Sequence, residues 1–149
     1  MEKSNYTPEQ ILKRLPKLLD KLRNAEPHDM THLTPRRVVE YLQEQRDSSE
    51  AGVYAFFCKV DDMPVYVGRT ATLWQRLGSQ HRSTLENQAA LTKAIKDKLG
   101  LKNMKEAREL LFSDYQVRFI AEPDVAARAM LEIFASISWS TEFDRFIEH

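Results

Sequence analysis

Two short triplets in the middle of the chain carry residue types that can exchange protons, Gly52-Val53-Tyr54 and Tyr66-Val67-Gly68. Eleven residues separate the two tyrosines. Arg76 and His81 follow the second triplet. A guanidinium can grip phosphate oxygens with two parallel hydrogen bonds. An imidazole takes up protons near neutral pH, whereas an unperturbed phenol, with a pKa near ~10, does so poorly. Residues of these types could hold a phosphate group and exchange protons beside it.

Basic side chains are concentrated in one stretch, although the chain as a whole has 22 basic and 22 acidic residues. Residues 69–108 carry nine basic side chains against three acidic ones. Such a stretch is typical either of a surface that binds a polyanion or of a solvated helix face. The nine basic residues are Arg69, Arg76, Arg82, Lys93, Lys96, Lys98, Lys102, Lys105 and Arg108.

The composition argues against several classes of protein. The apolar fraction of 42% and the charged fraction of 30% are ordinary for a globular chain. No apolar run approaches the roughly 20 residues of a membrane-spanning helix, and no secretory signal follows Met1. Cys58 is the only cysteine, which excludes an internal disulfide and a cysteine-based zinc ribbon. We therefore expect a cytoplasmic protein with no membrane association and no small-molecule cofactor.

Residues 1–50 are predicted to form an N-terminal helical extension that packs on the rest of the chain. Thr7-Pro8-Glu9-Gln10 has the form of a capping box, and apolar residues at helical spacing follow it as far as Leu22. Pro16 lies inside this pattern and predicts a kink or two short helices. Thr34-Pro35 predicts the start of a second helix. Neither helix could bury its apolar stripe alone, so both need the remainder of the chain.

Residues 51–149 are predicted to form an α+β domain, in which helices flank a small three-stranded antiparallel sheet. The three expected strands are Gly52–Val60, Val65–Gly68 and Tyr115–Ala121, the first two forming a hairpin. The expected helices start at Thr72, whose T-x-x-Q sequence has the form of a capping box, and cover Ala89–Leu99, Lys105–Phe112 and a last segment from Pro123 to about Trp139. The predicted order is β-β-α-α-β-α.

The two triplets, in this order, resemble the paired signature of the GIY-YIG nucleases. The resemblance covers about residues 51–140 and extends to Arg69 and Arg76, to His81, and to Glu132 on the last predicted helix. Either triplet alone would be a weak signal. The resemblance implies a GIY-YIG-like domain and a divalent-metal-dependent endonuclease that hydrolyses phosphodiester bonds in DNA with Mg²⁺ or Mn²⁺.

The resemblance also implies a role for each site residue. Glu132 would hold the metal, Arg76 would contact the scissile phosphate, and His81 and Arg69 would assist. Tyr54 and Tyr66 would orient or activate the attacking water, and the choice of base among these two and His81 stays open. A single carboxylate with several waters suits Mg²⁺. DNA is the implied partner, and the residues expected to contact its backbone are Arg69, Arg82, Lys93, Lys96 and Lys98.

Each of these residues also has an ordinary structural interpretation. Tyr54 and Tyr66 are of a type that strands favour, and Arg76 could be an exposed residue of a basic helix. Glu132 stands four residues after Arg128, which is the spacing of a surface ion pair. It falls at the margin of the apolar stripe of its helix, where either a carboxylate facing a cleft or a rim ion pair could lie.

The chain departs from the family pattern near its end. The family signature commonly closes on an asparagine after the glutamate, and here Ser140, Thr141 or Asp144 would replace its hydrogen bonds. Two other functions are therefore considered: a nucleic-acid-binding module without turnover on the same fold, and a protein-interaction adaptor that docks through residues 8–24. Any sequence selectivity is assigned to the helical extension, to Arg82–Asp114 or to a partner. The sequence leaves the oligomeric state open.

Overall fold

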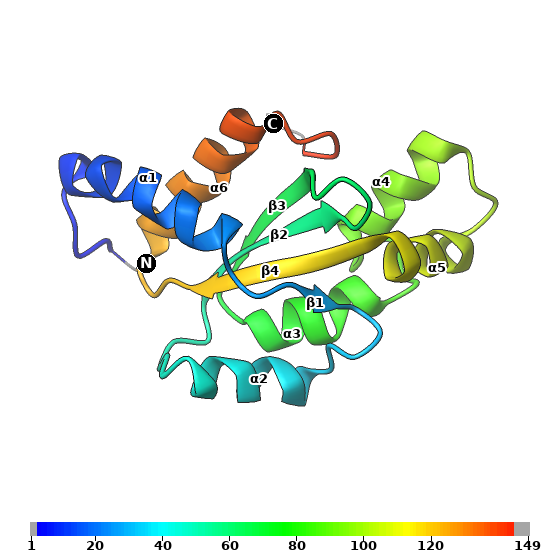
Figure 1. The fold of residues 1–149 in the computed structure, drawn as a ribbon, viewed down its shortest axis with the longest axis horizontal. Helices are drawn as coiled ribbons and strands as arrows, with labels where there is room; N and C mark the ends of the chain where they lie inside the picture. The colour runs from blue at the N-terminus through cyan, green and yellow to red at the C-terminus, as the bar shows by residue number, and fades with distance from the viewer. Residues whose placement is uncertain (1–2, 145–149) are drawn as a thin grey trace.

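A four-stranded antiparallel sheet runs through the middle of the protein between two layers of helices (Figure 1). The structure is a computed structural model and describes residues 3–144. The predicted α+β class is confirmed. The strands lie side by side in the order β1 (His28–Asp29), β4 (Tyr115–Ala121), β2 (Gly52–Cys58) and β3 (Pro64–Thr70). The prediction of three strands was wrong, because the sheet has a fourth.

The additional strand comes from the N-terminal region, which was expected to be entirely helical. His28 pairs with Val117 and Asp29 with Gln116 at the open edge of β4. A two-residue strand is too short to show the alternation of apolar and polar residues by which strands are recognised. Pro27, directly before the strand, argues against a regular helix there, but nothing in the sequence indicates a strand.

Within the described residues, six α-helices surround the sheet, close to where the sequence predicted them. They are α1 (Pro8–Arg23), α2 (Pro35–Glu44), α3 (Leu73–Gly78), α4 (Ala90–Leu99), α5 (Met104–Asp114) and α6 (Val125–Trp139), with a 3-10 turn η1 (Gln80–Arg82) after α3. The capping box at Thr7 is confirmed. The one expected at Thr72 is wrong, since its side chain makes no cap hydrogen bond. Instead the Thr72 backbone N–H donates to Thr70 Oγ1 at 3.1 Å.

Pro16 does not divide α1 into two helices. The helix runs without interruption from Pro8 to Arg23 and buries Ile11, Leu15 and Leu22 along one side. Burying a leucine or isoleucine side chain contributes about 1.5–3 kcal/mol, so several such side chains offset the roughly 3 kcal/mol cost of an internal proline. The apolar face of the helix therefore decides its length.

Strand β2 divides the hydrophobic core into two parts. Its alternate residues Tyr54 and Phe56 face α2, α3, α4 and α5, whereas Val53, Ala55 and Phe57 face α1 and α6. Figure 1 shows α1 and α6 on one side of the sheet and α2 and α3 on the other. The residues of α1 and α2 belong to these two parts, so the N-terminal region shares both with the rest of the chain.

The segment after α6 covers the free edge of β3. The Phe143 N–H donates to the Val65 carbonyl at 3.0 Å, and the Val67 N–H donates to Asp144 Oδ1 at 2.9 Å. A covered edge cannot recruit a foreign strand, and here the cover also brings an acidic side chain beside β3. Within residues 3–144, no helix is both long enough and apolar enough to cross a membrane.

Candidate active site

A buried cluster of a phenol, an imidazole and a guanidinium lies beneath the β2–β3 hairpin. The Tyr54 hydroxyl lies 2.8 Å from Nε2 of His81, and the tautomer of the imidazole sets which group donates. Arg76 Nε donates to the same hydroxyl at 3.1 Å. Arg76 Nη1 donates further to Gln80 Oε1 at 3.2 Å and to the Gln88 carbonyl at 3.0 Å. The structure thus brings together three predicted site residues that lie up to 27 positions apart.

The glycines of the two triplets leave the space that this cluster needs. Tyr54 on β2 stands opposite Gly68 on β3. A Cβ atom at position 68 would lie 2.3 Å from the Tyr54 hydroxyl, so any side chain there would displace the phenol. A Cβ at Gly52 would lie 2.1 Å from the Ile120 carbonyl oxygen. The Gly–tyrosine pattern therefore has a steric basis, because only glycine admits the Tyr54 ring and the close approach of β4.

Tyr66 and Glu132 line one cavity at the β3 edge of the sheet. The cavity has a volume of about 740 Å³ and lies between α4 and α6. Asp144 and two lysines of α4, Lys93 and Lys98, also line it. The Tyr66 ring centroid is 6.4 Å from that of Tyr54 and 5.9 Å from that of His81, so the cavity adjoins the buried cluster. The predicted metal ligand and both predicted tyrosines therefore lie at one place.

Glu132 does not form the predicted ion pair with Arg128. The Arg128 guanidinium turns away and donates to the carbonyls of Glu122 and Pro123. Glu132 Oε2 instead accepts from Arg69 Nη1 at 2.8 Å, across from α6 to β3. The Glu132 side chain is 25% exposed and that of Arg69 is 47% exposed. The partly exposed Arg69 is the only cation that forms an ion pair with Glu132 among the described residues, so a dication could take its place.

Burial controls the protonation of the site. It raises the pKa of Glu132, and the charge of Asp144 adds to this effect while Arg69 opposes it. Burial also raises the pKa of Tyr66 and, more strongly, that of Tyr54. The pKa of His81 is well below its ordinary value because of burial and then of the Arg76 charge. At neutral pH both phenols are therefore protonated and the imidazole is uncharged.

Access to water separates the three residues that were predicted as possible bases. Tyr54 is 1% exposed and His81 is 0% exposed, so neither reaches the cavity directly. Tyr66 lines the cavity, but its raised pKa makes the phenol a donor and acceptor of hydrogen bonds rather than a base. The three residues are thus arranged to position other groups, with Tyr66 alone able to touch a ligand.

The residues predicted to contact a nucleic-acid backbone fall into two groups. Four of them are ion-paired: Arg69 with Glu132, Lys93 with Asp97, Lys96 with Glu86 and Lys98 with Glu142. Arg82 behaves differently, because its guanidinium donates to the carbonyls of Met30 and Leu33 and lies over the Phe112 ring. Arg82 therefore ties the N-terminal region to α5 and lies outside the cavity of Glu132.

Asp144 is the residue that sequence reasoning could not single out. It was one of three candidates to replace the asparagine of the family, together with Ser140 and Thr141. The structure directs its carboxylate to the Val67 N–H, and the Thr141 hydroxyl donates to it as well. The spacing along the chain does not separate these candidates, because the distinction depends on which one meets the β3 edge.

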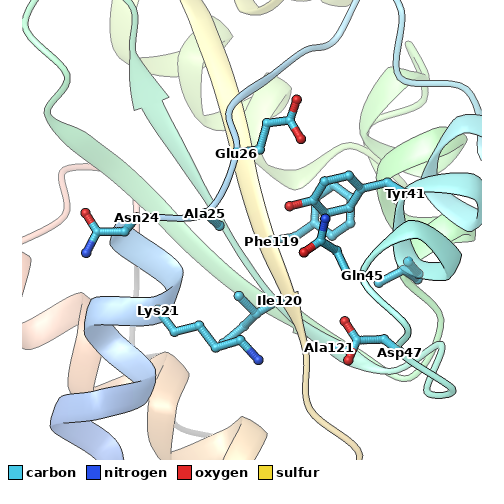
Figure 2. A pocket seen from close by; sticks show the side chains of 11 residues that line it. Lys21, Asn24, Ala25, Glu26, Tyr41, Gln45, Asp47, Phe119, Ile120 and Ala121 are labelled. Atoms are coloured by element: carbon cyan, nitrogen blue, oxygen red, sulfur yellow. The ribbon is translucent and has the colours of Figure 1, made fainter.

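A second cavity, of about 550 Å³, lies near β4 away from this site. Figure 2 shows Lys21 of α1 on one side of it and Tyr41 and Gln45, from the region of α2, on the other, with Phe119 beside Tyr41. Two acidic residues, Glu26 and Asp47, also line it. None of the residues predicted for the active site belongs to this cavity.

Comparison with protein-family models, with curated proteins and with solved structures returned no match to this chain. The residues themselves must therefore indicate what the site could hold. Within residues 3–144, no group of three or more histidine, cysteine, aspartate or glutamate side chains converges as metal ligands do. Glu132 and Asp144 line one cavity, and one or two carboxylates completed by water suit Mg²⁺ or Mn²⁺ rather than Zn²⁺.

Proposed function

We propose that the protein is a divalent-metal-dependent endonuclease that hydrolyses phosphodiester bonds in DNA, on a GIY-YIG-like domain. One observation carries the proposal: Glu132 and Tyr66, from opposite ends of the domain, line a single cavity next to the Tyr54–His81–Arg76 cluster. An accidental set of surface residues has no reason to bury a hydrogen-bonded phenol, imidazole and guanidinium at the end of such a cavity.

The reaction adds water to phosphorus and breaks the bond from phosphorus to one ester oxygen. Glu132, with Asp144 beside it, would hold the metal, which supplies Lewis acidity to the water and the phosphate. Desolvation of Glu132 and the nearby charge of Asp144 disfavour two bare carboxylates, so a dication in place of Arg69 relieves both effects. Arg69, released from Glu132, then becomes available to a phosphate.

The remaining residues orient the reacting groups. Arg76 is held through Nε and Nη1 and also interacts with Tyr66, which lines the cavity, so its guanidinium is the buried cation that would contact a phosphate oxygen beside Tyr66. Tyr66, protonated at neutral pH, holds the attacking water by a hydrogen bond. The Tyr54 hydroxyl, itself held by His81, fixes the position of Arg76 on the side away from the cavity. Fixed dipoles and cations of this kind stabilise the charge that develops on the phosphate without reorganising during the reaction.

A plasmid-nicking assay tests the proposal. We expect nicking in the presence of Mg²⁺ or Mn²⁺ and none in the presence of EDTA. Glu132→Gln should reduce the rate at least about a hundredfold, because the substitution removes the charge that holds the metal. Glu26→Gln is the matched control, since Glu26 lines the second cavity, and it should retain the wild-type rate. Equal rates for the two variants would contradict the proposal.

One observation favours the alternative of a nucleic-acid-binding module without turnover. Arg69 neutralises Glu132, and the three lysines of α4 are likewise paired with acidic residues. A site in which these pairs never open would bind a phosphate weakly and a metal not at all. Salt-dependent DNA binding without nicking under any metal would select this alternative.

A further inference from the structure

A second basic surface lies beyond α4, at the start of α5. A hollow of about 590 Å³ is lined by Lys96, Lys102, Lys105 and Arg108, with Glu86 as the one acidic residue. Glu86 pairs with Lys96 at 3.1 Å, which leaves the other three cations uncompensated. Among residues 3–144, no carboxylate forms an ion pair with any of these three. The hollow therefore carries an excess of positive charge.

Glu106, the acidic residue nearest in sequence to these cations, already accepts a hydrogen bond from a backbone N–H. Glu106 Oε2 accepts from the Lys102 N–H at 3.2 Å, and the Glu106 N–H donates to Asn103 Oδ1 at 3.0 Å. These two hydrogen bonds cap the start of α5, and within residues 3–144 Glu106 forms no ion pair with Lys102 or Lys105. Both lysines are exposed, so both are accessible to a ligand.

Two arginines share one aromatic ring at the side of this hollow. The guanidinium carbons of Arg82 and Arg108 each lie 5.0 Å from the centroid of Phe112. Arg108 Nε is buried and makes no hydrogen bond within the described part of the chain. The charge of Arg108, after burial, lowers the pKa of Arg82. Two guanidinium groups held together without an acid form an arrangement that an anion would stabilise.

The basic hollow continues the cavity of the candidate active site. Glu86 lines both of them, so the two meet at this residue. In the other direction, Lys105 and Arg108 also line a third hollow of about 330 Å³ that reaches Phe112 and includes one acidic residue, Glu109. The three spaces are therefore neighbours that share lining residues, in a series from Glu132 to Phe112. Such a series suits an extended chain of phosphates better than a single small anion.

We propose that Lys102, Lys105 and Arg108 form a second phosphate-binding surface, which holds the backbone of a nucleic acid whose scissile bond lies at Glu132. The inference rests on the proposed function for the identity of the polyanion. It adds an anchor remote from the reaction, whose charge is uncompensated, to a cavity whose own cations are ion-paired. Affinity for DNA thus comes mainly from these three residues at α5. The cavity lined by Tyr66 and Glu132 aligns the DNA strand that is to be cut.

The test measures DNA binding by fluorescence anisotropy in EDTA over a series of salt concentrations. The variant Lys102→Gln/Lys105→Gln/Arg108→Gln should bind a long duplex about tenfold or more weakly at low salt. Its slope of log K against log salt should be smaller by about 2 to 3, since each lost phosphate contact removes about 0.9. Thermal melting verifies that the variant is folded.

Three further variants keep the result interpretable. Lys13→Gln/Lys17→Gln/Lys21→Gln on α1 removes the same charge from exposed lysines that have no ion pair among the described residues, and it should retain the wild-type slope. Lys102→Gln/Lys105→Gln alters only exposed side chains, and about two-thirds of the loss in slope should remain if the triple variant proves unstable. Arg108→Lys keeps the charge and should keep the slope.

The outcomes separate this inference from the proposed function. The proposed second surface would be wrong if Lys102→Gln/Lys105→Gln/Arg108→Gln kept the wild-type salt dependence of DNA binding. It would also be wrong if the triple variant of α1 lost as much of that dependence, even if the protein nicks DNA. A selective loss of binding in the α5 variant would support the surface even if no metal produces nicking. Absence of DNA binding by the wild-type protein at low salt would overturn the inference directly.

Discussion

Two buried tyrosine–histidine pairs occur in this protein, and they differ in what the side chains contact. In the first pair the Tyr54 hydroxyl lies 2.8 Å from His81 Nε2, and Arg76 also donates to it. In the second pair the rings of Tyr41 and His28 meet edge to face with centroids 4.5 Å apart, and His28 Nε2 has no hydrogen-bond partner within residues 3–144. Both imidazoles have a lowered pKa because they are buried.

The difference shows that residue type and burial alone do not define a site. Both pairs adjoin a cavity that carries two acidic residues, Glu132 and Asp144 in one case and Glu26 and Asp47 in the other. Only the first pair is joined by hydrogen bonds to a guanidinium that continues towards its cavity. The second pair packs against Phe119 and fills the core. The buried hydrogen bonds from Tyr54 to an imidazole and a guanidinium are thus the distinguishing feature.

Removing the tyrosine hydroxyl from each pair should give the largest difference between them, in the kcat for nicking. Tyr54→Phe should lower kcat for nicking about a hundredfold, because Arg76 loses a bond that fixes it and small displacements of catalytic groups have effects of this size. Tyr41→Phe should leave kcat unchanged. Tyr54→Phe should also lose about 1–3 kcal/mol of unfolding free energy, since it removes a hydroxyl that is hydrogen-bonded to the buried His81 and to Arg76, and Tyr41→Phe should lose less. Steady-state nicking and denaturant unfolding provide the two measurements, and a comparable drop in kcat for both would erase the contrast.

Both tyrosine–histidine pairs should make the free energy of unfolding depend on pH in the same direction. An unfolded histidine takes up a proton as the pH falls through about 6.5, whereas His81 and His28 stay neutral in the fold. The contribution of each neutral, buried histidine to the free energy of unfolding is therefore fully present above about pH 6.5. It is lost as the pH falls below that value, by up to about 1.4 kcal/mol per pH unit for each histidine.

Denaturant unfolding at several pH values tests this expectation. His81→Gln and His28→Gln should each flatten the acid side of the stability curve, with the larger effect at His81, whose pKa lies further below its ordinary value. The slope is compared, because each substitution also lowers the stability at every pH. An unchanged slope in His81→Gln would mean that this imidazole is protonated in the folded protein.

Local sequence patterns predicted most of the elements. The apolar run of β2 with the turn before β3 predicted the hairpin, and Asp124 with the apolar face after it matches α6. The two-residue strand β1 leaves no pattern to find. At Thr72 the Thr70 hydroxyl accepts the N–H that a capping box would give to the Gln75 side chain, and the Thr72 side chain makes no cap hydrogen bond. Which group accepts this N–H depends on the backbone geometry and cannot be read from a four-residue motif.

The sequence indicated candidate residues for the site but not the contacts between them. The triplets and the late glutamate are enough to indicate Tyr54, Tyr66 and Glu132 as candidates. Nothing in the spacing indicates that Arg69 neutralises Glu132 or that Asp144 reaches the β3 edge, because both contacts form between segments more than sixty residues apart. The charge count of residues 69–108 likewise does not separate paired lysines on α4 from unpaired ones at α5.

Paramagnetic broadening of amide NMR signals by Mn²⁺ tests the central claim most directly, since it locates a weakly bound dication without requiring turnover. We predict that the signals of Tyr66, Glu132 and Asp144 broaden first, and that Glu132→Gln abolishes the effect. Glu26→Gln should leave it intact. Broadening centred on Glu26 and Asp47, or broadening near Tyr66 that survives Glu132→Gln, would contradict the assignment of Glu132 as the metal ligand.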